Sequence, residues 1–299
     1  MAPVIAAHRF TKCYGSARGV VDLTFAVEPG EVFGFLGPNG AGKTTTIWTL
    51  LDLIRPTSGD LTVFGLRPRE DAPAIHARVG YLPGELTLYE RMTAEDLLEA
   101  FGSFRGGVPR AAVVALADRL QLDVTRKIRS LSHGNKQKVG LLLAFAHEPE
   151  LLILDEPTQG LDPLIQQEFY AIVDGARARG ATIFLSSHVI PEVERVCDRV
   201  AIIREGRLVT VADIGDLKAQ ALRRLELRFD RPVPVETFAA LPSVRAAEAH
   251  GEAVRLTVLG VVDPVVKEAA KHTVVSIESE EPSLEEIFLA IYRDGGGPG

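Results

Sequence analysis

The sequence predicts an α/β protein with a largely parallel sheet, and two stretches carry this prediction. Residues 31–36 are predicted to form a buried strand that leads through a glycine-rich loop into a helix predicted from 43 to 54. Residues 151–154 are apolar without alternation, as expected for a strand that is covered on both faces. Strands that alternate with helices in this way are typical of a parallel sheet.

The glycine-rich loop fits the phosphate-binding pattern G-x-x-x-x-G-K-[ST]. Its residues are Gly37, Pro38, Asn39, Gly40, Ala41, Gly42, Lys43, Thr44 and Thr45. The glycines let successive N–H groups point at phosphate oxygens, and the helix behind adds its positive end. Lys43 is expected to reach the β- and γ-phosphates, and Thr44 to hold Mg²⁺. A turn that binds nothing is the alternative, and the strand-loop-helix context argues against it.

Length and composition exclude several classes of protein. The chain has 299 residues, enough for two domains. A net charge of -7 predicts no nucleic-acid partner. The two cysteines, Cys13 and Cys197, have no metal-ligand spacing, and no signal-peptide core follows the first residues. The longest uncharged apolar run, 139–146, is too short to span a bilayer. Any membrane role is therefore expected to act through a partner.

Further strands and helices surround the loop. Strands are predicted at 4–10, 20–27, 61–64, 78–82, 182–185, 199–203 and 207–211. Helices are predicted from Thr93 as N-cap, from Pro109 to about 120, from Ser132 to 147, from Pro163 to 179 and from Pro191 to 197. Residues 85–131 therefore form an all-helical insertion between strands.

The composition changes after the 207–211 strand. Residues 213–222 read as a linking helix, and the order that follows is β-α-β-β-α-β, which predicts a small ferredoxin-like α+β domain. A last helix over 284–292 has the capping box Ser283 and Glu286. The glycine-rich tail 294–299 is predicted to be disordered.

Polar residues follow two of the buried strands. Asp155 ends the 151–154 run and is expected to hold Mg²⁺, and Glu156 could orient or deprotonate a water beside the γ-phosphate. A capping or solvated acid pair is the alternative, which the phosphate loop disfavours. His188 follows the 182–185 strand at the same edge of the sheet, which favours a γ-phosphate contact over a structural role.

The residues alone leave the roles of two other features undecided. Tyr14 lies in a loop, where it either packs or stacks on a nucleotide base. Ser132, Gly134 and Asn135 stand at a helix start that suits an anion, but an ordinary N-cap explains them equally.

In their order and separations, these motifs resemble the nucleotide-binding subunits of ATP-binding cassette (ABC) transporters over about residues 4–215. The resemblance rests on the phosphate loop, the signature-like stretch 131–135, the acidic strand end 151–156, the loop 160–162 and His188. It implies an ABC-type P-loop NTPase with an antiparallel β subdomain and a helical insertion. It also implies ATP and Mg²⁺ as cofactors, hydrolysis by Glu156 assisted by His188, and adenine stacking by Tyr14.

The resemblance further implies a head-to-tail homodimer. Each ATP would lie between the phosphate loop of one subunit and Ser132, Gly134 and Asn135 of the other, while Asp162 links the two sites. The insertion would rest on a membrane permease, which places the protein in the cytoplasm, peripheral on the inner face of the membrane. The residues after the cassette are similar to those of ATPases that drive drug and antibiotic exporters.

The chain departs from the family pattern at two places. His133 and Asn135 replace Gly and Gln of the signature, and His133 must point away from the nucleotide. Gly84 stands where the family has a glutamine that binds Mg²⁺ and water. Either the next residue, Glu85, takes that role as a metal ligand, or water fills the gap.

The predicted division is a cassette over 1–215, an accessory domain over 216–293 and the tail. The competing functions are a soluble ABC ATPase acting on ribosomes or DNA, and a P-loop GTPase or kinase. One uninterrupted cassette without coiled-coil heptads disfavours the first, and the absence of Asn-Lys-x-Asp disfavours the second.

Overall fold

The computed structural model describes residues 2–15, 17–103, 107–219, 222–280 and 284–288. The chain divides into two compact units, Met1–Val211 and Ala212–Gly299. Each unit has its own hydrophobic core, and each is described by itself below.

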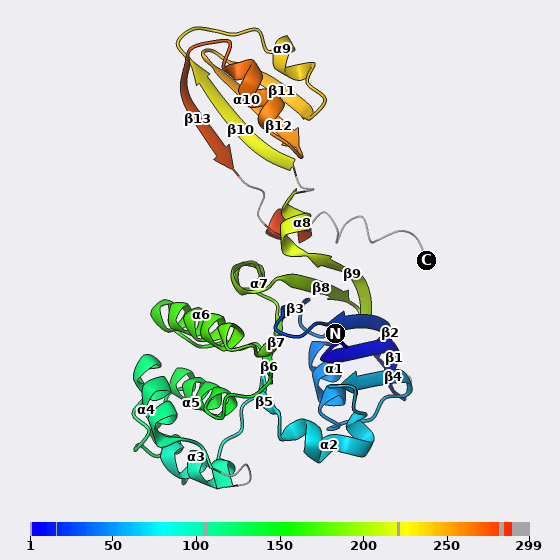
Figure 1. Ribbon diagram of the computed structural model, residues 1–299, viewed down its shortest axis with the longest axis vertical. Coiled ribbons are helices and arrows are strands. Elements are labelled where there is room, and N and C mark those ends of the chain that lie inside the picture. Colours follow the sequence, from blue (N-terminus) through cyan, green and yellow to red (C-terminus); the bar gives the residue numbers. More distant parts are fainter. Residues whose placement is uncertain (1, 16, 104–106, 220–221, 281–283, 289–299) are drawn as a thin grey trace. The chain divides into compact units, whose positions relative to one another are not determined.

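A six-stranded sheet in the order β5-β6-β7-β3-β8-β9 forms the centre of the first unit (Figure 1). Its strands are β3 (Val32–Leu36), β5 (Val79–Leu82), β6 (Leu151–Asp155), β7 (Thr182–Ser187), β8 (Arg199–Arg204) and β9 (Arg207–Asp213). The pairs from β5 to β8 are parallel. This confirms the predicted α/β class, and it brings the carboxyl ends of β3, β6 and β7 to one edge of the sheet.

A second, antiparallel sheet in the order β2-β1-β4 packs against the first. Its strands are β1 (Ile5–Tyr14), β2 (Ala17–Val27) and β4 (Ser58–Val63). Four phenylalanines fill the space between the sheets, with ring centroids as close as 5.3 Å for the pair Phe35 and Phe184. Phe25 of β2 and Phe33 of β3 belong to the same cluster, and Phe33 and Phe184 are fully buried. Each aromatic ring of this size buries roughly 150–250 Å², so the cluster contributes a large share of the apolar area between the sheets.

Seven helices are described in the first unit. They are α1 (Lys43–Leu50), α2 (Pro68–His76), α3 (Ala94–Ser103), α4 (Arg110–Arg119), α5 (His133–Phe145), α6 (Pro163–Ala178) and α7 (Ile190–Val196). In Figure 1, α5 and α6 lie on one side of the parallel strands, and α1 lies on the other side with the antiparallel sheet. The insertion contains α3, α4 and a short 3-10 helix at Ile128–Ser130.

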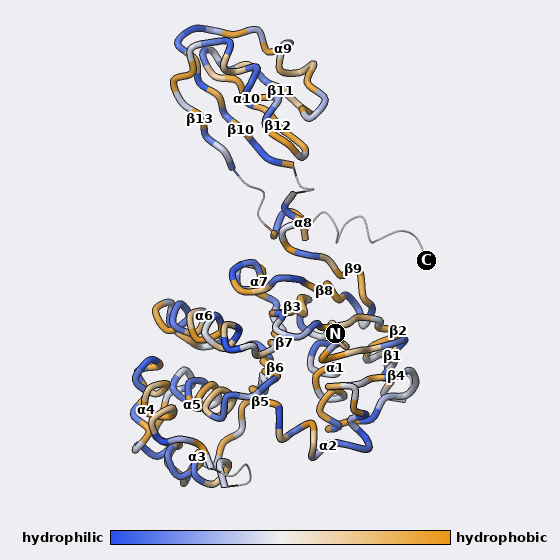
Figure 2. Tube along the Cα trace, in the orientation of Figure 1, coloured by the Kyte–Doolittle hydropathy of each residue, from blue (hydrophilic) through white to orange (hydrophobic). Residues whose placement is uncertain are grey.

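The local sequence explains where α6 begins and which face it buries. The Asp162 carboxylate accepts hydrogen bonds from the amides of Leu164 and Ile165, and Pro163 occupies the first turn, where its missing N–H costs nothing. Figure 2 shows hydrophobic and hydrophilic residues alternating along this helix. The buried ones recur at helical spacing: Ile165, Phe169, Ile172, Val173 and Ala176.

Two helices differ from the sequence prediction. The helix after the phosphate loop ends at Leu50 rather than at 54, because the chain turns there and Asp52 is left-handed with φ 53°. α2 was not predicted. It contains two prolines, Pro68 in its first turn, where a missing N–H is tolerated, and Pro73 inside, and the helix is kinked at Asp71.

The second unit is built on a four-stranded antiparallel sheet in the order β11-β12-β10-β13. Its elements are α8 (Ile214–Ala219), β10 (Leu222–Phe229), α9 (Glu236–Ala239), β11 (Val244–His250), β12 (Ala253–Leu259), α10 (Asp263–Ala269) and β13 (Val274–Glu280). The linking helix predicted over 213–222 is observed as Ile214–Ala219, because Asp213 ends β9, with its carboxylate accepting from the Gly215 and Asp216 backbone amides, and because Leu222 already begins β10.

The predicted last helix lies partly outside the described residues. Residues 284–288 are helical, with Leu284 buried. The proposed cap Ser283, the helix end at 292 and the tail 294–299 are outside the residues that the structure describes.

Candidate active site

The phosphate loop lies at the carboxyl end of β3, and its glycines let the loop backbone pack closely against neighbouring strands. A Cβ on Gly37 would lie 2.5 Å from the carbonyl oxygen of Ile203, and one on Gly42 would lie 2.4 Å from a methyl of Val20. Gly42 also has φ 108°, which favours glycine. Ala41 is buried within the loop. The backbone therefore takes a curled path that larger residues would block.

Lys43 is folded back over this loop. Its Nζ donates to the carbonyl oxygens of Gly37 at 2.7 Å and Pro38 at 3.3 Å, and the residue is 6% exposed. The ammonium group also lies 3.1 Å from Oε1 of Glu156. One buried cation is thus held between the loop and the carboxylate of the residue that follows β6.

Thr44 and Asp155 form the second link between the loop and β6. The Thr44 hydroxyl donates to Oδ2 of Asp155 at 2.9 Å, and the Ser186 hydroxyl donates to Oδ1. Burial raises the pKa of Asp155, while these two hydrogen bonds act in the opposite direction. A buried carboxylate beside a hydroxyl offers the hard oxygen ligands that Mg²⁺ prefers, so these residues fit the ion.

Glu156 connects the loop to His188. Nδ1 of His188 lies 2.8 Å from Oε2 of Glu156, and the Glu156 amide donates to the carbonyl oxygen of Ser186 at 3.0 Å. Glu156 has the left-handed φ of 50°, which is unfavourable for a residue with a side chain. Backbone strain of this kind recurs at functional positions.

These residues line one hollow of about 530 Å³. Its walls come from the phosphate loop, the acids after β6 and the loop after β5: Tyr14, Gly19, Asn39, Gly40, Gly42, Lys43, Thr44, Thr45, Trp48, Tyr81, Pro83, Gly84, Glu85, Asp155, Glu156, Gln159 and His188. Tyr14 is the last residue of β1, paired with Ala17 of β2, rather than the loop residue that the sequence predicted. It is 44% exposed, with Nζ of Lys12 5.1 Å from its ring centroid. Its ring is therefore free to stack on a planar ligand in the hollow.

The loop after β5 comes close to Asp155. A Cβ on Gly84 would lie 3.2 Å from Oδ2 of Asp155, and Glu85 is exposed beside it. Burial raises the pKa of Tyr81 to about 12, the charge of Asp155 acts in the same direction, and a hydrogen bond with Trp48 opposes both. Tyr81 is therefore a protonated donor at neutral pH.

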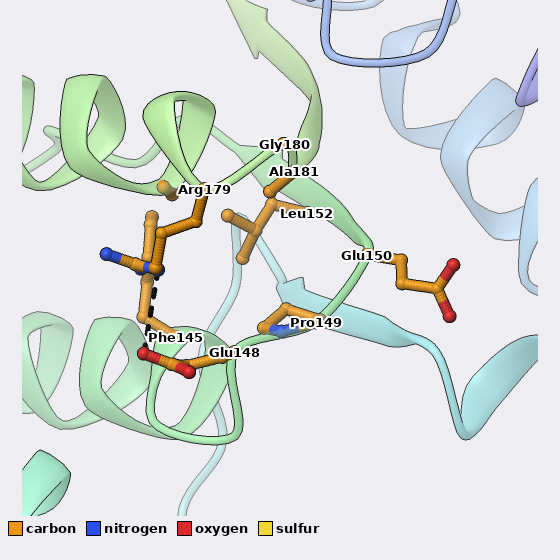
Figure 3. Close-up of a pocket in the computed structure, with 9 residues that line it drawn as sticks. Phe145, Glu148, Pro149, Glu150, Leu152, Arg179, Gly180 and Ala181 are labelled. Atoms are coloured by element: carbon orange, nitrogen blue, oxygen red, sulfur yellow. Dashed lines mark ion pairs between the residues drawn. The ribbon is translucent and has the colours of Figure 1, made fainter.

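A smaller hollow of about 300 Å³ lies at the opposite edge of the sheet (Figure 3). Phe145, Leu152 and Ala181 line it, and an ion pair of Glu148 and Arg179 at 3.5 Å stands at its rim. The amino ends of β6 and β7 meet there, whereas ligands of open parallel sheets bind beyond the carboxyl ends. The geometry therefore favours the larger hollow as the active site.

The sequence model of the family described as "ABC transporter" matches residues 20–159, which include the phosphate loop and the acids at the end of β6. BcrA of Bacillus licheniformis, a bacitracin transport ATP-binding protein, is 34% identical over 306 residues that cover 99% of each chain. This chain belongs to the ABC transporter family of ATP-binding proteins. Like the family, it binds and hydrolyses ATP.

Other comparisons agree with this assignment. LnrL, a linearmycin resistance ATP-binding protein of Bacillus subtilis (strain 168), is 31% identical and covers 96% of this ABC protein and 97% of LnrL. A solved ATP-binding subunit of an ABC transporter is 31% identical with a TM-score of 0.68, covering 73% of this chain and 92% of that one. A dimeric bacterial ABC transporter cassette, 21% identical, shares the fold with a TM-score of 0.64, covering 70% of this chain and 98% of that one.

The remaining predicted residues of the ABC protein lie away from the hollow. The Ser132 hydroxyl accepts a hydrogen bond from the backbone N–H of Asn135 at 3.3 Å and caps α5, and Gly134 packs against Gly160. Asp162 caps α6. These residues are not among those that line the larger hollow. Within one subunit, therefore, the phosphate loop and the start of α5 are separate surfaces.

Several lining residues were missed by sequence reasoning. Trp48 carries a signal in the sequence, because it lies one turn beyond Thr44 on the helix that follows the loop. Tyr81 and Pro83 precede the position of the expected glutamine, and the same local argument would have found them. Gly19 and Gln159 reach the hollow through the fold and carry no signal of their own.

Proposed function

We propose that this ABC ATPase powers a membrane permease that exports an antibiotic or a related small molecule. The observation that carries the proposal is the match with BcrA over 99% of both chains, which includes the second unit as well as the cassette. That relative is named for bacitracin transport, and LnrL for linearmycin resistance. A role on ribosomes or DNA is disfavoured by the same names.

Lys43 is proposed to exchange partners when ATP binds. Its ammonium group now contacts two loop carbonyls and one carboxylate, that of Glu156, and the phosphates of ATP would offer it several charged oxygens at once. Movement of Lys43 towards the β- and γ-phosphates would free one oxygen of Glu156. The glutamate would therefore become available only when nucleotide is present. Gly37, Pro38, Asn39, Gly40, Ala41, Gly42 and Thr45 are proposed to supply the surrounding phosphate-binding backbone.

Glu156 is proposed to accept the proton of the attacking water. As the water oxygen bonds to the γ-phosphorus, the bond to the β-phosphate oxygen breaks and ADP leaves. His188, 2.8 Å from the carboxylate, would hold it in the required orientation and contact the γ-phosphate. Tyr14 is proposed to stack on the adenine.

Thr44, Asp155 and Glu85 are proposed to hold Mg²⁺, directly or through water. When bound, the ion would neutralise charge that develops on the phosphate oxygens. Asp155 is suited to this by its burial and its two hydroxyl donors, which fix both carboxylate oxygens. Glu85 is suited by its place in the hollow beside Gly84.

A head-to-tail dimer is proposed to complete the site. The start of α5 presents exposed Ser132 with N–H groups that suit an anion. Ser132, Gly134 and Asn135 of one subunit would face the ATP of the other, with Asp162 between the two sites. The dimeric cassette of the same fold is consistent with this arrangement.

The rest of the chain is proposed to serve the permease. The insertion at about 85–131 would contact it, which would place the protein on the inner face of the membrane. No helix among the described residues is long and apolar enough to cross a bilayer. The sheet order β11-β12-β10-β13 with α9 and α10 between strands supports a ferredoxin-like accessory domain, proposed over 216–293. The compact unit Met1–Val211 supports a separate cassette, proposed over 1–215, with a boundary four residues later than that of the unit.

Glu156→Gln tests the proposed chemistry. The variant should bind ATP but hydrolyse it at least about 100-fold more slowly, because an amide cannot accept the proton. It should also accumulate an ATP-dependent dimer in light scattering. Glu148→Gln is a matched control, since Glu148 is likewise left-handed and ion-paired but lies at the far hollow. Wild-type turnover in Glu156→Gln would remove this residue from the mechanism.

The exporter role needs a separate experiment. Wild type and Glu156→Gln would be coexpressed with a candidate permease that has about six spans of 20 apolar residues. Wild type should copurify with that permease from membranes and lower the cellular level of the exported antibiotic. Copurification without an ATPase-dependent change in that level would contradict export.

A further inference from the structure

A buried glutamine joins α5 to the backbone of Glu156. Gln137 lies one turn into α5 and is 3% exposed. Its Nε2 donates to the carbonyl oxygen of Pro157 at 3.1 Å and is 3.4 Å from that of Glu156. An amide group buried against two consecutive carbonyls satisfies acceptors that would otherwise be costly to bury.

These two carbonyls belong to the strained part of the strand end. Glu156 has φ 50°, a conformation that persists only where the surroundings impose it. The Ser186 carbonyl holds the Glu156 amide at 3.0 Å, and Gln137 holds the peptide on the other side of the same residue. The direction of the Glu156 side chain therefore depends on both contacts.

The start of α5 touches the same segment at a second place. A Cβ on Gly134 would lie 2.5 Å from the carbonyl oxygen of Gly160, and one on Gly160 would lie 2.5 Å from Cδ2 of His133. His133, the departure from the family signature, is thus packed against Gly160. Through these contacts and those of Gln137, the start of α5 packs closely against residues 156–160.

We propose that Gln137 is a positioning residue for ATP hydrolysis, which fixes the Glu156–Pro157 peptide so that the Glu156 carboxylate faces the γ-phosphate. The proposal rests on the catalytic role proposed above for Glu156. The proposal adds a physical link between the catalytic Glu156 and the start of α5, which is proposed above to face the partner's ATP. A shift of α5 when its first turn meets the partner's ATP is carried by Gln137 to Glu156 of the same subunit.

Two variants remove the donor while they keep the size of the side chain. Gln137→Met cannot donate, and Gln137→Glu turns carboxylate oxygens towards the two carbonyls. Both should lower kcat about 100-fold, because small misplacements of a catalytic group have effects of this size. KM and the ATP affinity measured by Trp48 fluorescence should stay within about twofold, because the ground-state contacts with ATP are intact.

Gln166→Met is the matched control. Nε2 of Gln166 donates to the Leu161 carbonyl at 3.2 Å, so this variant loses a similar bond in the neighbouring segment without touching residues 156 and 157. Its kcat should stay within about twofold of wild type. Melting temperatures of all variants would be measured alongside turnover.

Wild-type kcat in Gln137→Met and Gln137→Glu would overturn the proposal. A parallel loss of kcat, ATP affinity and melting temperature in both would also overturn it, since that pattern indicates a merely structural role. Glu156→Gln separates this inference from the function on which it rests. If Glu156→Gln is inactive while the Gln137 variants are not, only the role of Gln137 fails; wild-type turnover in Glu156→Gln refutes the catalytic assignment itself.

Discussion

The buried carboxyl of Glu192 predicts how the free energy of unfolding depends on pH. This carboxyl is 1% exposed in α7, where Oε2 accepts from the Ser187 hydroxyl at 2.6 Å. Burial raises the pKa of Glu192 from its ordinary 4.5 to about 7, although hydrogen bonds with Ser187 and Thr158 oppose the increase. The folded protein therefore binds this proton more tightly than the unfolded chain does.

The sign of the stability effect follows from this difference. Below pH 4.5 the carboxyl is neutral in both states and costs nothing. As pH rises from 4.5 to about 7, the unfolded chain loses the proton first, so the folded state becomes progressively less stable. One pH unit corresponds to 1.36 kcal/mol, so the full penalty above pH 7 is about 3 kcal/mol.

Glu192→Gln should remove the penalty. The amide oxygen can still accept from Ser187, and the side chain carries no charge at any pH. In nucleotide-free protein, we expect the variant to be more stable than wild type by about 3 kcal/mol at pH 8 and by about 0.5 kcal/mol at pH 4.5. Urea unfolding followed by the fluorescence of Trp48, the only tryptophan, would report on the first unit.

Glu99→Gln is the control, because Glu99 is exposed and its replacement should change stability by less than about 0.5 kcal/mol at either pH. A stability difference for Glu192→Gln that is the same at pH 4.5 and pH 8 would refute the reasoning. So would a variant that is less stable than wild type at pH 8.

Two further predictions concern ligands of the larger hollow. Tyr14→Ala should weaken ATP binding about fivefold by loss of stacking, whereas Tyr14→Phe should not; equal affinities in Trp48 fluorescence titrations would exclude stacking. Glu85→Ala should raise the Mg²⁺ concentration for half-maximal hydrolysis about tenfold if Glu85 supports the ion, with Glu99→Ala as an exposed control. An unchanged Mg²⁺ dependence would mean that Glu85 is not a ligand.

Local motifs allowed the sequence to predict much of the site. The phosphate loop, Asp155, Glu156 and His188 each follow an apolar run, and parallel strands bring their carboxyl ends to one edge, so the structure unites them in one hollow. The α/β class follows from the same runs. The sequence did not predict α2. This helix contains two prolines, and tertiary packing that buries Pro68 and Ile75 stabilises it.

Other features depend on contacts between distant segments. Gln137 is predictable as a buried position of α5, but its partners are 19 and 20 residues away, and nothing in the pattern names them. The contact of His133 with Gly160 is of the same kind. Such contacts arise from the angle at which α5 packs on the sheet, which periodicity does not determine.

The missing glutamine at Gly84 is the clearest case in which the structure changes the interpretation. From the sequence, glycine at this position reads as a lost ligand. In the fold, a Cβ there would lie 3.2 Å from Oδ2 of Asp155, closer than side chains usually approach. A side chain there would therefore require the loop or the Asp155 carboxylate to shift by a few tenths of an ångström. Glycine leaves room for this approach, and Tyr81 of β5 and Glu85 of the loop line the same hollow. Glu85→Ala tests directly whether Glu85 takes the role of the missing glutamine.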